Sequence, residues 1–417
     1  MPGADGASFG MRFEGNWEVA WRMPLLRTFI AAGSALLAFA VTAAAVEVKT
    51  AVLRIDRTLP LPISRLDIPP GDLGFAGAVL ATEDNQTTGR FIGMEFTLET
   101  RAVAPEAAGE ALDALKAEGV AIVVVLANGE ETLALADRAG PGMLILNAGA
   151  RDEALREENC RANILHVSPS RSMTTDAVVQ FLMWKKWPRL FLIHGSHPED
   201  NALADAYRAS ARKFGAKIVE ERLFEDTGGA RRTDTGHVLV QRQIPVFTQD
   251  AEDHDVIVAA DEADVFAAYL PFHAWEPRPV VGSAGLIPVT WMPALEAWGA
   301  TQFQRRFERL TLRGMREEDY QAWLALRVVG EAVTRTSSAD PLAIRDYALS
   351  EAFELAAFKG QKVTFRPWNG QLRQPIMLTD RHVMVSVSPQ DGYLHQVSPL
   401  DTLGRDRPET ACTAFGG

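Results

Sequence analysis

The side chains that could do chemistry by themselves lie in two short stretches. His194 and His197 flank Ser196, which suggests a nucleophilic hydroxyl beside a histidine base, and Asp261 follows an apolar run further along. Residues so near in sequence cannot easily form a Ser-His pair that a third group orients. The sequence therefore favours a protein without a catalytic site. An enzyme that acts through His194, His197 or Asp261 is the alternative.

Motifs that would indicate a bound phosphate, nucleotide or metal ion are absent from the sequence. It contains no GxxxxGK[ST], no HExxH, no GxSxG and no GxGxxG. The acidic run 250–255, with Asp261, Glu262 and Asp264 behind it, lacks the alternating spacing and central glycine of a calcium loop. We interpret it as a solvated acidic edge and predict neither a cofactor nor a metal site.

Small and polar residues follow several apolar runs that look like buried strands. In open α/β sheets, ligands bind outside the carboxyl ends of the strands. Turns are rich in Gly, Asn and Ser for structural reasons, so any one loop has a purely structural alternative. Taken together, the loops predict one ligand-binding cleft. Its candidate residues are Asn128, Gly129, Asn147, Ala148, Gly149, Ser170, His194, Ser196, His197, Asp261, Ser283 and Ala284.

Strand-like and helix-like runs alternate along the chain in two successive series. The first series has strands at 51–55, 94–98, 120–126, 144–146 and 164–167, with helices at 73–87, 105–116 and 131–139. The second has helices at 174–186 and 202–214, strands at 190–193, 217–221, 256–264 and 279–285, and a polar loop at 226–236. This rhythm predicts an α/β protein with two doubly wound, Rossmann-like lobes.

Length, charge and the N-terminal region bound the class of protein. A chain of 417 residues exceeds one usual core, and a net charge of -12 argues against nucleic acid as a partner. Basic residues around Met23, the apolar run 29–41 and the small residues 43–45 predict a cleavable signal peptide. We expect translation to start at Met23 after an upstream extension and the mature exported protein to begin near Val46. An uncleaved anchor is the alternative.

Cys160 and Cys412 are the only cysteines of the chain. In an oxidising compartment, an isolated pair favours a disulfide, which would tie the C-terminal tail to the middle of the chain. Two unrelated buried thiols are the alternative.

The stretches "GDLGFAGAVLATEDNQTTG", "GMLILNAGARDEAL" and "VTFRPWNGQLRQPI" resemble type I periplasmic solute-binding proteins of the branched-chain amino acid transport family. More narrowly, "CRANILHVSPSRSM" and "LHQVSPLDTLGRDRPE" resemble the ABC transporter substrate-binding protein of the PQQ-dependent alcohol dehydrogenase system. The resemblance implies a small-molecule ligand, a membrane permease as partner and a PQQ-dependent dehydrogenase as a further partner. A non-transport accessory or sensing role beside such a dehydrogenase is the alternative.

The family also implies three crossovers between the lobes, for which residues 166–172, 283–290 and 350–365 are the candidates. We therefore expect lobe 1 to comprise 46–168 and 287–352, lobe 2 to comprise 172–284 and 353–390, and a C-terminal tail to comprise 391–417.

This chain differs from the family at the residue that binds the ligand ammonium. The family's second lobe gives a carboxylate to the ligand ammonium in a Gly-Pro-Glu-Gly-like turn, where this chain has Gly282-Ser283-Ala284-Gly285. A buried ammonium without a countercharge costs several kcal/mol. The resemblance therefore disfavours a free amino acid as ligand, although Asp261 or Glu262 could compensate.

Overall fold

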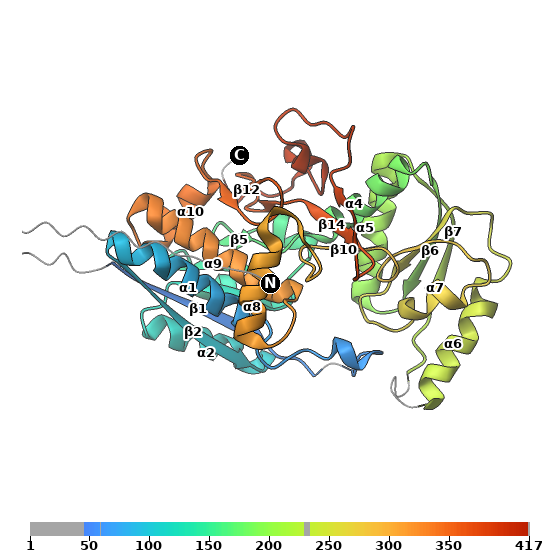
Figure 1. Cartoon of the computed structure of the whole chain (residues 1–417), viewed down its shortest axis with the longest axis horizontal. Coiled ribbons are helices and arrows are strands. Elements are labelled where there is room, and N and C mark those ends of the chain that lie inside the picture. The colour runs from blue at the N-terminus through green and yellow to red at the C-terminus, as the bar shows by residue number, and fades with distance from the viewer. Residues whose placement is uncertain (1–45, 59, 229–233, 416–417) are drawn as a thin grey trace, which may run out of the picture. The chain divides into compact units, whose positions relative to one another are not determined.

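The computed structural model describes residues 46–58, 60–228 and 234–415 (Figure 1). The predicted extension, the start at Met23 and the signal peptide lie outside the described residues and stay predictions. Within the described ranges, no helix is both long and apolar enough to cross a membrane.

The first lobe is built on a five-stranded parallel sheet with the order β2-β1-β3-β4-β5. Its strands are β1 (Val46–Ile55), β2 (Met94–Val103), β3 (Ile122–Leu126), β4 (Leu144–Asn147) and β5 (Ile164–His166). Its helices are α1 (Phe75–Ile92), α2 (Ala108–Ala117), α3 (Gly129–Ala139), α8 (Ala300–Thr311), α9 (Glu317–Thr336) and α10 (Pro341–Leu349). This is a doubly wound arrangement, as the strand and helix rhythm predicts.

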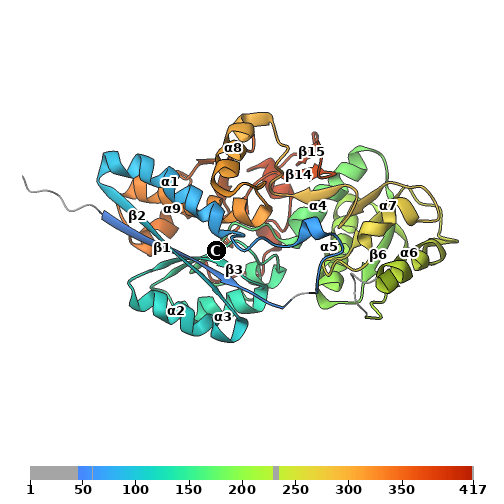
Figure 2. The same ribbon diagram turned by 60° about the horizontal axis from the view of Figure 1, so that its bottom comes forward.

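Alternation of side chains along the strands explains why helices cover both faces of this sheet. Val48 and Val52 of β1 pack with α1, α8 and α9 in one apolar cluster. Ala51 and Leu53, which point the other way, pack with α2 and α3 in another cluster. Figure 2 shows α1 and α9 on one side of β1 and β3, and α2 and α3 on the other.

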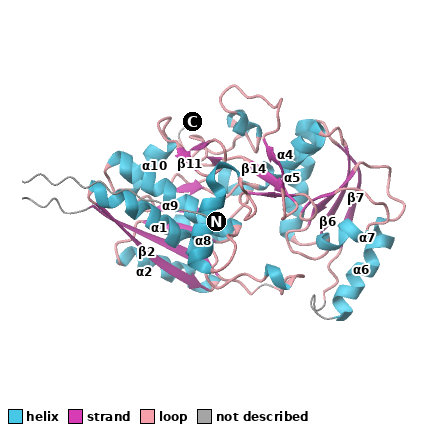
Figure 3. Ribbon diagram, in the orientation of Figure 1, coloured by secondary structure: helices cyan, strands magenta, loops and turns pink. Residues whose placement is uncertain are grey.

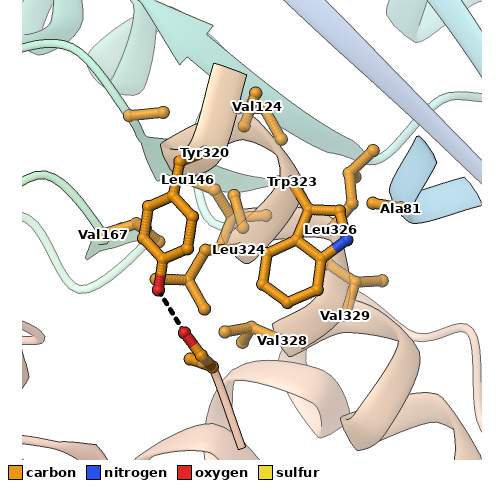
Figure 4. Packing of buried hydrophobic residues seen from close by; sticks show 14 of the residues in the cluster. Ala81, Val124, Leu146, Val167, Tyr320, Trp323, Leu324, Leu326, Val328 and Val329 are labelled. Atoms are coloured by element: carbon orange, nitrogen blue, oxygen red, sulfur yellow. Dashed lines mark hydrogen bonds between the residues drawn. The ribbon is translucent and has the colours of Figure 1, made fainter. Parts of the chain in front are cut away.

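The larger cluster owes much of its apolar surface to α9 (Figure 4). Trp323 and Val329 of this helix belong to the same buried cluster as Val124 of β3, and each of the three is at most 2% exposed. The hydroxyl of Tyr320 donates a hydrogen bond of 2.7 Å to the carbonyl of Ala357, so its polar end is satisfied within the core.

The second lobe has a four-stranded parallel sheet with the order β7-β6-β8-β9 (Figure 3). Its strands are β6 (Arg189–Gly195), β7 (Lys217–Phe224), β8 (Val256–Ala260) and β9 (Val280–Gly282), and its helices are α4 (Arg171–Trp184), α5 (Pro198–Phe214), α6 (Asp234–Thr248) and α7 (Leu270–His273). Leu190 and Leu192 pack with α4 and α5, whereas Phe191 and Ile193 face the cluster that contains Ile244 of α6. The predicted α/β fold with two lobes is confirmed. Helix α6 begins inside the stretch predicted as a polar loop.

Two small sheets complete the fold. The sheet β10-β14-β15, from β10 (Ile287–Val289), β14 (Ile376–Thr379) and β15 (Met384–Ser388), connects the lobes. The sheet β11-β12-β13, from β11 (Leu355–Ala356), β12 (Lys362–Phe365) and β13 (Leu372–Arg373), packs on the first lobe. Side chains of β14 alternate between the lobes, since Met377 joins the first-lobe cluster and Ile376 and Leu378 join that of α4.

The packing of residues 353–373 differs from the expected division of the chain. This segment was expected in lobe 2, but Phe353, Val363 and Leu372 are buried in the large first-lobe cluster. Gln371 also forms a parallel bridge with His166 of β5. The short strands of this segment continue the first lobe beyond β5. The third passage of the chain between the lobes therefore lies between Leu372 and Ile376 and not at 350–365.

The C-terminal tail returns across both lobes. The expected disulfide between Cys160 and Cys412 is confirmed. Asp401 is buried and accepts hydrogen bonds from Nε of Arg366, at 2.9 Å, and Nε of Arg373, at 2.8 Å. On α4, a carboxylate oxygen of Asp176 accepts the backbone N–H of Gly404 at 2.8 Å.

Candidate functional site

A cleft with a volume of about 520 Å³ lies where strands of both large sheets end. The loops after β3, β4 and β8, the end of β9 and strand β10 form its walls, which fits the rule for ligand sites in open α/β sheets. Its lining residues are Ala127, Asn128, Gly149, Ala150, Arg151, Asp152, Arg171, Thr174, Leu203, Tyr207, Asp261, Glu262, Gly282, Ser283, Ile287, Pro288, Val289, Glu317 and Arg381. Both lobes therefore contribute to one site.

Four of the twelve predicted site residues line this cleft. They are Asn128, Gly149, Asp261 and Ser283.

Asn128 and Gly129 begin helix α3. The side chain of Asn128 accepts the backbone N–H of Glu131 at 2.9 Å, and the Glu131 carboxylate accepts the N–H of Asn128 in return. Gly129 is buried, and a Cβ atom there would lie 2.5 Å from Cγ of Asp152. Gly129 thus lets the loop after β4 approach the start of α3.

Asn147 and Ala148 are buried behind the cleft and do not face it. The amide oxygen of Asn147 accepts the N–H of Ala150 at 2.8 Å, and its amide nitrogen lies 3.0 Å from Nδ1 of His166. Burial keeps the pKa of His166 well below its usual value, so this imidazole is neutral. Asn147 therefore shapes the turn that presents Gly149 to the cleft.

Asp261 lines the cleft, but its carboxylate is committed to the following turn. It accepts the backbone N–H groups of Val265, Phe266 and Ala267 at 2.7 to 3.0 Å. Burial raises the pKa of Asp261 to about 6, and these N–H donors oppose that rise. The backbone N–H of Asp261 in turn donates to Oγ of Ser283 at 2.9 Å, so Ser283 ties β9 to this turn. Ala284 lies beside the apolar cluster of α6 and α7 and does not line the cleft.

His194, Ser196 and His197 do not line the cleft. Nε2 of His194 lies 3.3 Å from Glu221 on β7. Nε2 of His197 lies 2.9 Å from a carboxylate oxygen of Asp226, and this hydrogen bond raises the pKa of His197. Ser196 accepts the backbone N–H of Asp226. The three residues stabilise the edge of the second sheet.

Ser170 caps helix α4, and its neighbour Arg171 reaches the cleft. Oγ of Ser170 accepts the backbone N–H of Met173 at 3.3 Å. Arg171 donates from Nε and Nη2 to Glu262, with a shortest distance of 2.7 Å, and from Nη1 to Asp152 at 3.1 Å. The nearby carboxylate of Glu262 helps to raise the pKa of Arg171 against the opposing effect of its burial. This cation joins the loop after β4 in the first lobe to the loop after β8 in the second.

The charged groups of the cleft are what the sequence reasoning missed. Arg151, Asp152, Arg171, Glu317 and Arg381 all line the cleft. Arg151 and Asp152 directly follow the predicted "NAGA" turn, so extending that turn by two residues would have found them. Nothing local marks Arg171 or Glu317, because each starts a helix and reaches the cleft only through the tertiary fold.

Among the described residues, no group of His, Cys, Asp and Glu has an arrangement that could hold a metal ion. The carboxylates of the cleft instead bind arginine side chains and backbone N–H groups. The site can therefore hold a polar molecule by hydrogen bonds from both lobes.

Comparison with known proteins agrees with this geometry. Residues 70–243 match the family model described as "Periplasmic binding protein". A branched chain amino acid ABC transporter periplasmic ligand-binding protein from Burkholderia xenovorans LB400 superposes with a TM-score of 0.68 at 16% identity, covering 88% of this chain and 100% of its own. No curated protein sequence matches the chain.

Two further solved structures carry ligands. A branched-chain amino acid transporter substrate binding protein from Streptococcus pneumoniae, in complex with isoleucine, has a TM-score of 0.60 at 14% identity and covers 82% of this chain and 98% of its own. A solute binding protein of an ABC transporter from R. palustris, in complex with benzoate, has a TM-score of 0.62 at 11% identity and covers 88% of this chain and 99% of its own. The fold is that of type I periplasmic binding proteins, as the resemblance implied.

Proposed function

We propose that this chain is the periplasmic substrate-binding component of an ABC transporter and that it captures a small molecule in the cleft between its lobes. The observation that carries the proposal is the cleft of about 520 Å³ lined by strand-end loops of both sheets. A ligand that contacts both walls favours the closed arrangement of the lobes over the open one, and only such differential binding can drive closure. The matched family and the solved relatives support this function.

We further propose that the transported compound is linked to PQQ-dependent alcohol oxidation, with a quinoprotein dehydrogenase as a functional partner. The sequence resemblance of "CRANILHVSPSRSM" and "LHQVSPLDTLGRDRPE" supports this link. The second stretch contains Asp401, which binds Arg366 and Arg373 within the fold.

Thermal-shift and calorimetric screening of the purified protein would test the proposal against alcohols, their acids, amino acids and PQQ. We expect at least one class to raise the unfolding temperature, because a ligand that binds only the folded state stabilises it. Small-angle scattering should show a more compact particle with the same ligand. If no compound shifts the unfolding temperature and no compaction follows, the proposal is refuted.

A matched pair of variants places the binding in the cleft. Arg151→Trp puts a bulky ring on the cleft wall and should abolish the shift, since Arg151 lines the cleft and its side chain is 33% exposed. Arg138→Trp is the control, because Arg138 pairs with Asp113 on the outer helices and does not line the cleft. A ligand that binds both variants equally well would lie elsewhere on the protein.

A further inference from the structure

Each carboxylate that lines the cleft already has a partner within the protein. Glu262 binds Arg171 through both of its oxygens, and Asp152 binds the same guanidinium. Asp261 is held by three backbone N–H groups. Glu317 accepts the backbone N–H and the hydroxyl of Thr290, at 2.6 and 2.8 Å.

The contacts of Glu262 are the most informative of these. It is the acidic side chain that the second lobe presents to the cleft beside Asp261, and its side chain is 20% exposed. A ligand ammonium at this wall would need Glu262 as its countercharge. Arg171 already fills that role from the first turn of α4, and its own side chain is only 11% exposed.

We infer that Arg171 is a specificity-determining residue whose guanidinium takes the place of a ligand ammonium, so that the cleft selects molecules with acceptor oxygens and no amino group. This inference rests on the proposed function, since it assigns a ligand class to the same cleft. An ammonium entering here would have to displace Arg171 or lie close to it, and two cations in one partly dehydrated cleft repel each other.

The donors that remain in the cleft define what the ligand must offer. A guanidinium carries five N–H bonds, and Arg171 uses one on each of its three nitrogens toward Glu262 and Asp152. The other two N–H bonds of Arg171 have no partner among the described residues, so a ligand that reaches this guanidinium could accept them. Arg151 adds further donors, because its contact with Glu317 is long, at 3.5 Å. A carboxylate or carbonyl group fits these donors, and a planar carboxylate fits a guanidinium well.

Matched pairs of compounds test the inference. Calorimetric titration of the purified protein would compare 3-phenylpropanoate with phenylalanine and 4-methylpentanoate with leucine, which differ only by the amino group. We expect the compound without an amino group to bind at least about tenfold more tightly in each pair that binds, a difference of about 1.4 kcal/mol. Equal or tighter binding of the amino acid would overturn the inference while supporting the proposed function.

Variants of the ion pair give an independent readout. Arg171→Gln frees Glu262 and should shift the preference toward the amino acid by at least about tenfold. Arg171→Lys retains the cation and should keep the wild-type order. The double variant Arg171→Gln with Glu262→Gln should lose the gain, because the freed carboxylate is then gone. Circular dichroism and the unfolding temperature would establish that each variant is folded.

The remaining outcomes also decide between the two ideas. A folded Arg171→Gln variant with the wild-type preference would refute the role of Arg171, whatever the ligand of the wild-type protein. If no member of either pair binds any variant, and the wider screen of the proposed function also finds no ligand, then the proposed function fails and the inference fails with it. If only neutral alcohols bind, the requirement for a carboxylate or carbonyl acceptor is overturned.

Discussion

Replacing Cys160 and Cys412 by serine should release the end of the C-terminal tail and destabilise the whole chain. The disulfide joins residues that are 252 positions apart. In the chain-entropy model, opening a loop of that length returns about 5.5 kcal/mol of conformational entropy to the unfolded chain at 25 °C. The folded tail keeps other contacts in the variant, chiefly those of Asp401 and the bond from the N–H of Ala411 to Glu157.

The expected result is a loss of roughly 3 to 5 kcal/mol in the free energy of unfolding, because the constraint acts mainly on the unfolded state. Urea unfolding followed by tryptophan fluorescence and circular dichroism would measure it in wild type and in the Cys160→Ser, Cys412→Ser variant. Wild type treated with dithiothreitol provides the matched control, since it removes the same bond without changing a side chain. The variant itself should not respond to dithiothreitol.

The reasoning would be refuted if the variant and the oxidised wild type unfolded at the same urea concentration. It would also be refuted if dithiothreitol lowered the midpoint of the variant, because no disulfide remains in it to be reduced. A stable variant would mean that the buried pairs of Asp401 with Arg366 and Arg373 hold the tail without help.

Three further predictions concern polar side chains of the two lobes. Asn147→Ala should cost about 2 to 4 kcal/mol of unfolding free energy in a urea titration, because it leaves the N–H of Ala150 and Nδ1 of His166 without their partner in the core. Asn201→Ala, at an exposed position on α5, is the control and should cost much less in the same titration. The pair His194→Ala and His197→Ala should leave ligand affinity unchanged in calorimetry, since neither lines the cleft, and a large loss would restore the histidines to the site. Burial lowers the pKa of Lys359 to about 7 in the folded protein, so the unfolded chain binds more protons between about pH 7 and 10. The free energy of unfolding should therefore rise with pH over that range. Thermal unfolding at a series of pH values should show this rise in wild type and not in Lys359→Met, and an equal slope in both would contradict the prediction.

The alternation of strand-like and helix-like runs in the sequence was sufficient to predict most of the fold. Runs such as residues 122–126 are apolar at every position, and the structure buries all of them in a strand covered on both faces. Helix α6 could not be predicted from its first residues, since Asp234 and Gly236 read as part of a polar turn and Pro245 lies inside the helix. Tertiary packing of its later residues, such as Ile244, overrides these local signals.

The candidate site was predictable at the level of loops more than of side chains. Asn147 was identified as ligand-facing because it ends a strand, yet the pleat of β4 turns its side chain into the core toward His166. The next residues of that loop, Gly149 to Asp152, do line the cleft. A turn tells where the backbone emerges, but the direction of each side chain depends on the register with neighbouring strands, which one sequence does not show.

Helix α4 connects the two features that join the lobes. Its first residue, Arg171, holds the ion pairs of the cleft, and Asp176 and Gln180 on the same helix bind the tail at Gly404 and Thr402. A helix rises about 1.5 Å per residue and moves as a rigid body over such a length, so a displacement that reaches Arg171 also reaches the tail contacts. The tail is in turn fixed to the first lobe through Cys160. If the lobes close on a ligand as we propose, α4 shifts against this restraint, and the disulfide variant should change the affinity of the cleft as well as the stability of the chain. Unchanged affinity would show that the strands β10 and β14, and not the tail, hold α4 in place.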